Sequence, residues 1–382
     1  MRTPETAAEL AEELRRFALH ERTIELQGSG SKRLMAGPVE NADECVSTSA
    51  LARVLQYEPN DLTISVEAGL PWRELARTLA EHRQMVPLDP PFSQTATVGG
   101  VIAANTSGPR RRLYGSARDM VIGMRFATLE GKLVESGGMV VKNVAGLDMA
   151  KLMIGSFGTL AAIASVNFKV QPMPEIERSF LLSFPTAAAA IAARNAIVKS
   201  PLQPSALDLL NPAAGETAGN AAWLLAVRTG GNAASVDRYE REFAKGWGGL
   251  AYDGAPQERL WRHVEEFTPD FLASHPEGAV VRASCTLKEV EPVLASFPGP
   301  ALARAGSGVC YGYFALAGDA AAWIGQAAAR GWRAVVEYAP AGWKRGAELW
   351  PAPGGDIEIM RRVKSLFDPG NLLNRGRLYG RI

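Results

Sequence analysis

Residues 97–119 read TVGGVIAANTSGPRRRLYGSARD and combine a double glycine, a run of small side chains, three consecutive arginines and a Tyr-Gly pair. Glycine and proline disfavour helices, which counts against a helix interior between residues 99 and 109. The polar residues 105–107 are equally unsuited to the interior of a strand. The stretch therefore predicts bare backbone against which a large flat molecule, or a charged one, can lie.

Two further glycine-rich stretches accompany it: QGSGSK at 27–32, after a predicted strand at 23–26, and GSFGTL at 155–160. Glycines after a strand let backbone N–H groups converge on a phosphate, and the serines add hydroxyl donors. The first loop is neither GxGxxG nor GxxxxGK[ST], which excludes the Rossmann and P-loop interpretations. Ordinary turns are the alternative. The small-residue runs are longer than turns need, and they predict walls along which an extended cofactor runs.

The composition of the chain bounds its partners and its location. A length of 382 residues with 47% hydrophobic residues predicts two to three domains with a buried core. A net charge of +1 gives no field for nucleic acid or for an anionic membrane. The acidic N-terminal stretch MRTPETAAELAEELRRF is not a signal peptide, and no apolar run reaches the roughly 18 residues of a membrane span. We expect a soluble cytoplasmic protein.

The three cysteines, Cys45, Cys285 and Cys310, lie far apart in the sequence. No CxxC spacing is present for zinc or for an iron–sulfur cluster, and no metal site is expected. The expectation is three buried, inert thiols in a reducing compartment.

Hydrophobic periodicity places the remaining elements. A helix is predicted from Trp72, with Leu75 and Leu79 on the same face, and two strands are predicted around a Gly131 turn. From residue 176 onward, strand-like runs such as WLLAVRT and RAVVEYA alternate with helical ones. This pattern predicts a second α+β domain, with one antiparallel sheet and helices packed on one face.

The order of motifs resembles that of a known superfamily. QGSGSK, PLDPP, TVGGVIAANTSG, LYGSARD, LEGKLVESGG, VVKNVAGLDMAKLMIGSFGTL and FDPGNLLNRGRL follow one another as in FAD flavoproteins of the vanillyl-alcohol-oxidase type. SGPRRRLYG together with KNVAGxD is most similar to the FAD-binding subunits of glycolate dehydrogenases (glycolate oxidases). The resemblance implies an α+β protein, with a PCMH-type (vanillyl-alcohol-oxidase-like) FAD domain at 1–175. An antiparallel-sheet α+β cap domain is implied at 176–350, and a C-terminal segment, 351–382, that returns to the FAD domain.

The resemblance also implies which residues contact FAD. They lie in the three glycine-rich stretches, and they are Gly28, Ser29, Gly30, Ser31, Lys32, Thr97, Gly99, Gly100, Ala103, Ala104, Asn105, Gly108, Gly155, Gly158, Thr159 and Ile163. Covalently flavinylated relatives often carry a histidine in the first glycine loop, and residues 27–32 contain none, which implies noncovalent FAD. Leu147 and Ala161 depart from the family pattern, which has Tyr and Gly there.

The catalytic residues are not assigned by the resemblance. Related D-2-hydroxy-acid dehydrogenases place a metal-binding HxGDGNxH motif near residues 303–314, where this chain has ARAGSGVCYGYF without histidine or acid. An arginine inside an apolar strand needs a carboxylate, substrate or subunit partner, which makes Arg282 and Arg304 weak candidates, and Tyr311 is a third. The arginines at 110–112 either face a phosphate or carboxylate or belong to a solvated loop.

The resemblance implies a non-autonomous FAD subunit that oxidises glycolate to glyoxylate. The implied partners are a larger FAD subunit and an iron–sulfur subunit, which place the chain in the cytoplasm or peripherally at the inner membrane. One alternative is a self-sufficient FAD-dependent dehydrogenase for D-lactate or another small 2-hydroxy acid. A scaffold whose glycine loops bind nothing is the alternative from a different class.

Overall fold

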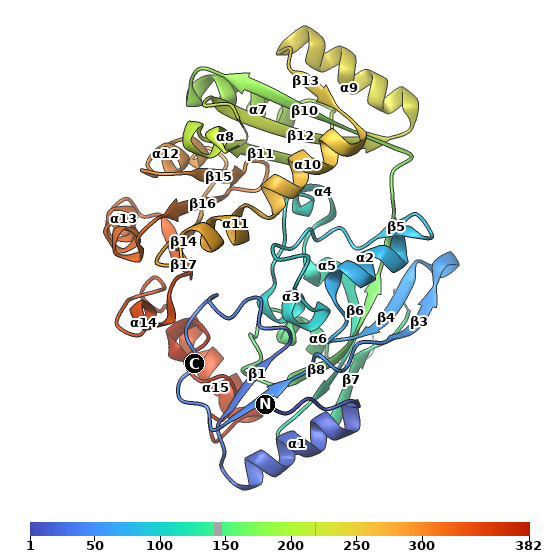
Figure 1. Cartoon of the computed structure of the whole chain (residues 1–382), viewed down its shortest axis with the longest axis vertical. Helices are drawn as coiled ribbons and strands as arrows, with labels where there is room; N and C mark the ends of the chain where they lie inside the picture. Colours follow the sequence, from blue (N-terminus) through green and yellow to red (C-terminus); the bar gives the residue numbers. More distant parts are fainter. Residues whose placement is uncertain (141–146, 218) are drawn as a thin grey trace. The chain divides into compact units, whose positions relative to one another are not determined.

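A computed structural model describes residues 1–140, 147–217 and 219–382 of the chain (Figure 1). The chain forms two compact units. The first comprises residues 1–106, 116–173 and 352–382, and the second comprises residues 107–115 and 174–351. The expected domain borders at 175 and 350 lie close to these limits. Residues 107–115, which the sequence placed in the FAD domain, instead group with the second unit.

An antiparallel sheet of five described strands organises the first unit, in the order β3-β4-β8-β6-β7. Its central strand, β8, has almost every residue buried, which fits a strand covered on both faces. Two short pairs, parallel β1-β2 and antiparallel β5-β9, complete the strands of this unit. The strands are β1 (Ile24–Gln27), β2 (Glu44–Ser47), β3 (Val54–Glu58), β4 (Thr63–Glu67), β5 (Gln84–Met85), β6 (Val121–Ala127), β7 (Leu133–Gly137), β8 (Ala162–Lys169) and β9 (Gln171–Pro172).

Helices of the first unit follow the apolar spacing of the sequence. In α1 (Ala7–Leu19), Leu10, Leu14 and Phe17 are buried on one face and share a core with residues of β1, β6 and β8. In α2 (Trp72–Ala80), the predicted Trp72, Leu75 and Leu79 are buried. Besides α3, described below, the other helical segments of this unit are η1 (Pro59–Asp61), α5 (Ala117–Met120), α6 (Met149–Met153), α15 (Asp356–Phe367) and η2 (Tyr379–Arg381).

The TVGG stretch contains a helix, contrary to the expectation from its glycines. Residues Val98–Ala104 form α3, and the side chain of Thr97 caps it by accepting a hydrogen bond from the Gly100 amide at 3.3 Å. Val101 and Ile102 are fully buried, so tertiary packing outweighs the low helix propensity of glycine. The helix ends at Asn105, which adopts the left-handed conformation.

The C-terminal segment is tied to the first unit by a buried charged cluster. The Lys364 ammonium of α15 donates to the Asp368 carboxylate at 2.6 Å and to the carbonyls of Thr159 and Leu373 at 2.8 and 3.0 Å. The Asp368 carboxylate also accepts from the amides of Leu372 and Leu373. Each charged group therefore has several partners, as a buried ion pair requires. The DPGNLL stretch is held by this cluster against the loop before β8.

The second unit contains an antiparallel sheet of eight described strands, in the order β13-β10-β12-β11-β15-β16-β14-β17. The strands are β10 (Ile176–Phe184), β11 (Ala206–Leu210), β12 (Trp223–Gly231), β13 (Leu250–Tyr252), β14 (Ala279–Ser284), β15 (Ala301–Arg304), β16 (Val309–Phe314) and β17 (Arg333–Tyr338). The helices are α4 (Arg111–Tyr114), α7 (Ala187–Lys199), α8 (Pro212–Glu216), α9 (Ala233–Gly246), α10 (Gly254–Glu265), α11 (Phe267–Ser274), α12 (Val290–Ala295), α13 (Ala317–Ala329) and α14 (Ala341–Lys344).

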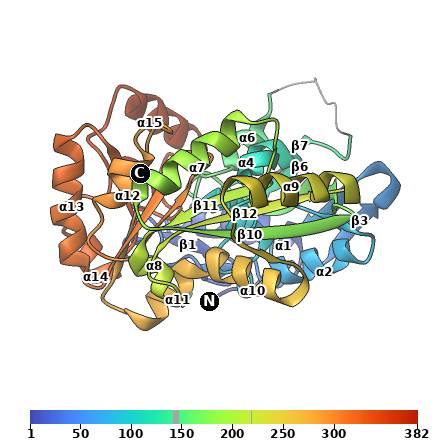
Figure 2. The ribbon, with the colours of Figure 1, turned by 90° about the horizontal axis from the view of Figure 1, so that it is seen from above.

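Helices cover both faces of this sheet, and the expectation of helices on one face is wrong. The helices α7, α9, α12 and α13 pack on the apolar face, where residues such as Phe180, Leu209 and Val281 form one core. The helix α10 lies on the other face, because the Trp261 indole donates to Ser179, the neighbour of Phe180 that points the opposite way. Figure 2 shows α7 and α9 on one side of β10 and β12 and α10 on the other. No helix among the described residues is long and apolar enough to cross a membrane.

Candidate cofactor site

The first glycine loop is the centre of a pocket in the first unit. The loop leaves β1 at Gln27, whose carbonyl accepts from the Thr48 amide at 2.9 Å, and the Gly28 carbonyl accepts from the Ser47 hydroxyl at 2.9 Å. The parallel strand β2 thus fixes where the loop starts. At Gly30 the backbone has φ +77°, a conformation that favours glycine.

The loop and α3 approach each other so closely that only glycine fits at position 28. A Cβ built on Gly28 would lie 2.1 Å from Oγ1 of Thr97, the residue that caps α3. A Cβ on Gly99 would lie 2.8 Å from the Ala68 side chain on the other side of the helix. The two glycines thus allow α3 to lie between the loop and the strand end. The motif spacing that the sequence analysis singled out reflects this close packing.

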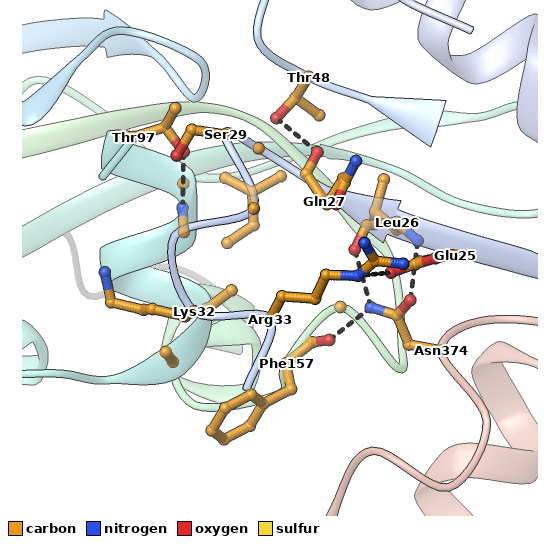
Figure 3. A pocket seen from close by; sticks show the side chains of 18 of the residues that line it. Glu25, Leu26, Gln27, Ser29, Lys32, Arg33, Thr48, Thr97, Phe157 and Asn374 are labelled. Atoms are coloured by element: carbon orange, nitrogen blue, oxygen red, sulfur yellow. Dashed lines mark hydrogen bonds and ion pairs between the residues drawn. The ribbon is translucent and has the colours of Figure 1, made fainter. Parts of the chain in front are cut away.

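Asn374 joins the C-terminal segment to two of the glycine-rich stretches. Its side-chain oxygen accepts from the Leu26 amide at 2.7 Å, and its amide nitrogen donates to the carbonyls of Leu26 at 3.0 Å and Phe157 at 2.7 Å. Figure 3 shows the Asn374 side chain between these two residues. Asn374 is not among the cofactor residues predicted from the sequence. Its place in the DPGNLLN motif, four residues after the glycine, was the available signal.

Cationic side chains surround the same pocket. Lys32 is only 6% exposed, and its ammonium lies 5.8 Å from the centre of the Phe92 ring. The Arg377 guanidinium donates to the carbonyls of Lys32 and Arg33 at 2.7 and 3.1 Å. Arg33 pairs with Glu25 at 3.4 Å. Three cations and one carboxylate leave a positive balance, which suits a pyrophosphate.

Most of the predicted cofactor residues line this pocket. They are Gly28, Ser29, Gly30, Ser31, Lys32, Thr97, Gly99, Gly100, Ala103, Ala104, Gly158 and Ile163. The lining residues that the prediction omitted are Glu25, Leu26, Gln27, Arg33, Val39, Thr48, Phe157, Ala161, Asn374 and Arg377. The methyl group of Ala161, where the family pattern has glycine, is therefore part of the wall.

Four predicted residues lie outside the lining. Asn105 ends α3 in the left-handed conformation, and Gly155 has φ +83° with its amide donating to the Ile102 carbonyl. Thr159 is fully buried, and its hydroxyl donates to the Ser156 carbonyl at 2.8 Å. Gly108 belongs to the second unit. The motif KNVAG at 142–146 lies outside the described residues.

The pocket fits part of a dinucleotide cofactor. Its walls are glycine and alanine, its cations face an anion, and it measures about 100 Å³. Sites for drug-sized ligands measure about 300–1,000 Å³, so this cavity holds one portion of such a cofactor. The small residues and cations fit the pyrophosphate of FAD. Among the described residues, no histidine lines the pocket, and no group of three or more potential metal ligands occurs.

The three weak catalytic candidates lie together on the second unit's sheet, on the face opposite the core. Arg282 and Tyr311 are cross-strand partners, and the Arg304 guanidinium lies 5.7 Å from the centre of the Tyr311 ring. Both arginines pair with carboxylates, Arg282 with Glu337 at 3.0 Å and Arg304 with Asp208 at 3.1 Å. The expectation that each buried arginine needs a partner is met within the sheet itself.

Electrostatics on this face change the proton chemistry available. Burial raises the pKa of Tyr311 to about 12, which makes it a poor base at neutral pH. Burial also raises the pKa of Glu337, although Arg282 opposes the shift. Glu337 is thus a better candidate base than Tyr311, and it was not predicted from the sequence because RAVVEYA shows only a strand pattern.

Among the three arginines at 110–112, Arg110 pairs with Glu177 at 3.1 Å within the second unit.

Comparison with known proteins gives two family matches. Residues 1–137 match the family model of an FAD binding domain, and residues 352–378 match the C-terminal domain of FAD linked oxidases. Both matched segments contribute residues to the pocket. The second match contains Asn374, which joins the C-terminal segment to the glycine loop.

The curated relatives named here match less than half of the chain. The chain is 37% identical over 155 residues to glycolate oxidase subunit GlcE of Escherichia coli, covering 40% of this chain and 44% of the relative. It is 33% identical to a mitochondrial D-lactate dehydrogenase [cytochrome] of Arabidopsis thaliana, covering 44% of this chain and 29% of the relative. The chain is 30% identical to glycolate oxidase subunit GlcD of Bacillus subtilis, covering 42% of this chain and 34% of the relative. The matched region thus spans less than half the length of these relatives.

Solved structures share the fold over almost the whole chain. p-Cresol methylhydroxylase with substrate bound aligns with a TM-score of 0.76 at 15% identity, covering 98% of this chain and 87% of that one. An alkyldihydroxyacetonephosphate synthase aligns with a TM-score of 0.71 at 20% identity, covering 97% and 75%. The predicted PCMH-type FAD domain and cap are confirmed at the level of the fold.

Proposed function

We propose that this chain is the FAD-binding subunit of a complex that oxidises glycolate to glyoxylate. Its match to the FAD binding domain and to the C-terminal domain of FAD linked oxidases, together with its p-cresol methylhydroxylase fold, supports an FAD-dependent role. The observation that carries the proposal is the cradle built from the glycine loop, α3 and Asn374. The similarity to the GlcE and GlcD subunits supports the substrate class. When bound, FAD supplies the oxidant for a 2-hydroxy acid by accepting two electrons.

The residues of the chain position the cofactor and leave it noncovalently held. The amides of residues 28–32 and the Lys32 ammonium would face the pyrophosphate, while Ala103, Ala104 and Ala161 limit the space beside it. The pocket lining among the described residues includes no histidine, which supports noncovalent attachment. Acid precipitation of the purified protein is expected to release all flavin into the supernatant, and flavin retained in the pellet would refute this.

Partners are proposed because the described residues contain no group of three or more potential metal ligands that could hold an iron–sulfur cluster. A larger FAD subunit and an iron–sulfur subunit would remove electrons that this chain has no cluster to carry. The second unit carries the Arg282–Glu337 ion pair on its sheet. Glu337, a residue of β17 whose pKa is raised by burial, is its candidate base. A position inside the cell, either free or held at the inner membrane by the partners, is part of the same proposal.

The test is to assay the FAD-loaded chain with glycolate, D-lactate and a dye acceptor, first alone and then with the co-expressed partners. We expect turnover of glycolate only in the complex. The similarity to D-lactate dehydrogenases supports one alternative, a self-sufficient D-lactate dehydrogenase. Rapid D-lactate turnover by the isolated chain would establish that alternative and refute the subunit role. A purified protein without flavin absorbance would favour the scaffold interpretation.

A further inference from the structure

Two of the three cysteines lie side by side in the second unit. Cys285 follows the end of β14, Cys310 belongs to β16, and their sulfur atoms are 4.0 Å apart. The Cys285 amide donates to the Gly308 carbonyl at 2.9 Å, which fixes this approach. A Cβ built on Gly308, whose φ is +69°, would lie 2.1 Å from the Cys285 carbonyl oxygen. Only glycine therefore permits the turn that brings the thiols together.

The two thiols differ in exposure. Cys310 is fully buried in the core beneath α7 and α12, whereas Cys285 is half-buried. Cys45, in the first unit, is half-buried as well. The expectation of three buried thiols is therefore wrong for Cys45 and Cys285. Cys285 is the member of the pair that a small solute reaches.

A buried guanidinium without a carboxylate lies beside the pair. Arg194 of α7 is 1% exposed and donates to the carbonyls of Ala305 and Leu287, both at 2.7 Å. Its described hydrogen-bond partners are these two carbonyls and no carboxylate, and its Nε has no acceptor among the described residues. Burying a positive charge without a counter-charge is costly. The groups whose negative charge favours the guanidinium are the two thiols and, as a smaller contribution, the Glu291 carboxylate.

The surrounding groups favour the charge on Cys285. The hydrogen bond with Cys310 lowers the pKa of Cys285 most, and the field of Arg194 adds to it, against desolvation and the charge of Glu289. The pKa of Cys310 is raised well above its ordinary value by the same hydrogen bond and by burial. Glu289 is itself engaged by the amide and hydroxyl of Thr286. A thiolate at Cys285 and a thiol at Cys310 satisfy both the guanidinium and the shared hydrogen bond.

We propose that Cys285 and Cys310 form a peroxide-reactive thiol pair, a modification site apart from the cofactor pocket. The Cys285 thiolate attacks hydrogen peroxide and becomes a sulfenic acid, with hydroxide as the leaving group. The Cys310 thiol then attacks that sulfur, and a disulfide forms with the release of water. In total, two thiols and one peroxide give one disulfide and two waters.

Closure needs a local movement that the fold allows. A disulfide needs a sulfur separation of about 2.05 Å, so the atoms must approach from 4.0 Å. Cys285 lies beyond the last residue of β14 and moves more easily than Cys310, which is paired with Ala283 within the sheet. Cys285 is half-buried, so a thiol reductant reaches its sulfur and the disulfide is open to reduction. The pair is therefore reversible by thiol reductants.

The experiment uses the full chain loaded with FAD and treated with increasing hydrogen peroxide. After alkylation, trypsin releases Cys285 in residues 283–288 and Cys310 in residues 305–330, and mass spectrometry detects a linked product that dithiothreitol separates. The variant Cys310→Ser should stop at the sulfenic acid of Cys285, trapped with dimedone. Cys45, whose pKa burial raises, is an internal control. We expect Cys285 to alkylate at least about tenfold faster than Cys45 at neutral pH.

Arg194→Gln removes the guanidinium, whose field lowers the pKa of Cys285, and should slow alkylation of Cys285 while leaving that of Cys45 unchanged. If this variant does not fold, the pH profile of alkylation in the unmodified chain replaces it, with a lower midpoint expected for Cys285 than for Cys45. The proposal is overturned if Cys285 reacts no faster than Cys45. It is also overturned if peroxide that oxidises Cys45 leaves the two peptides of the pair unlinked.

Discussion

The pocket of the first unit and the polar face of the second unit's sheet are built from different kinds of residue. The pocket is built from backbone and small side chains, with Gly28 and Gly99 in contact with Thr97 and Ala68. The sheet face is built from long charged side chains that pair with one another, such as Arg304 with Asp208. The two regions therefore depend on different features of the sequence. A backbone site needs particular residues at fixed positions, whereas a paired face depends on which strands become neighbours.

We expect the largest effect on stability at the buried charged cluster of Lys364 and Asp368, which holds the C-terminal segment. Lys364→Met leaves the Asp368 carboxylate buried without its ammonium, and breaking a buried pair in this way costs about 3–5 kcal/mol. Thermal or urea unfolding would measure it, with Lys132→Met as control because that side chain is 72% exposed. The control should change stability by less than about 0.5 kcal/mol. Equal effects of the two substitutions would show that the C-terminal segment does not hold the first unit together.

Gly28→Val should abolish flavin binding while leaving the second unit folded. The added Cβ would collide with Thr97 at 2.1 Å, and about 2.7 kcal/mol of ligand-linked stability would be lost if FAD normally sits near 100 times its Kd. Flavin absorbance and melting temperature report the result. Gly138→Val is the matched control, because nothing lies within 4 Å of its Cβ. A yellow Gly28→Val protein with unchanged melting would reduce this glycine to an ordinary turn.

Lys32→Gln and Arg33→Gln sharpen the comparison within the pocket itself. Lys32 is 6% exposed and the Arg33 side chain is 70% exposed, so we expect only Lys32 to make a desolvated contact with the cofactor's pyrophosphate. A lost charge-assisted hydrogen bond costs about 1.5–3 kcal/mol, which is about ten- to a hundredfold in Kd for FAD. Arg33→Gln should change Kd by less than about fivefold. Fluorescence titration of the FAD-free protein measures both, and a larger effect of Arg33 would contradict the assignment.

The smallest effect concerns the charged face and its pH dependence. Because burial raises the folded-state pKa of Glu337, the folded state binds the proton more tightly, and this contribution to stability grows as pH falls toward the unfolded value near 4.5. The stability of the unmodified chain relative to Glu337→Gln should therefore increase as the pH is lowered from 7.5 to 5.5.

Asp119→Asn in the first unit provides the opposite sign. Hydrogen bonds from Ser116 lower the pKa of Asp119, so its stabilising contribution is lost only as pH falls below about 3.8. Its difference from the unmodified chain should stay constant between pH 7.5 and 5.5. Parallel trends for the two variants, measured as urea midpoints, would remove the distinction between the two regions.

The features that the sequence predicts correctly are local ones. Glycines at 28, 30 and 99, and the spacing of Trp72, Leu75 and Leu79, report requirements of backbone conformation and helix period that neighbouring residues impose. Most of the cofactor-site prediction therefore coincides with the pocket. The helix α3 was missed because buried Val101 and Ile102 stabilise it through contacts with distant residues, against the propensity of its glycines.

Only the tertiary structure decided the pairings. Asn374 meets Leu26 across 348 positions, and Arg282 meets Glu337 across 55, and no pattern along the chain states such contacts. The approach of Cys285 to Cys310 depends in the same way on the register of β14 and β16 and on the turn at Gly308. Long-range neighbours depend on how the whole core packs, because each side chain gains its partner only once the strands have aligned.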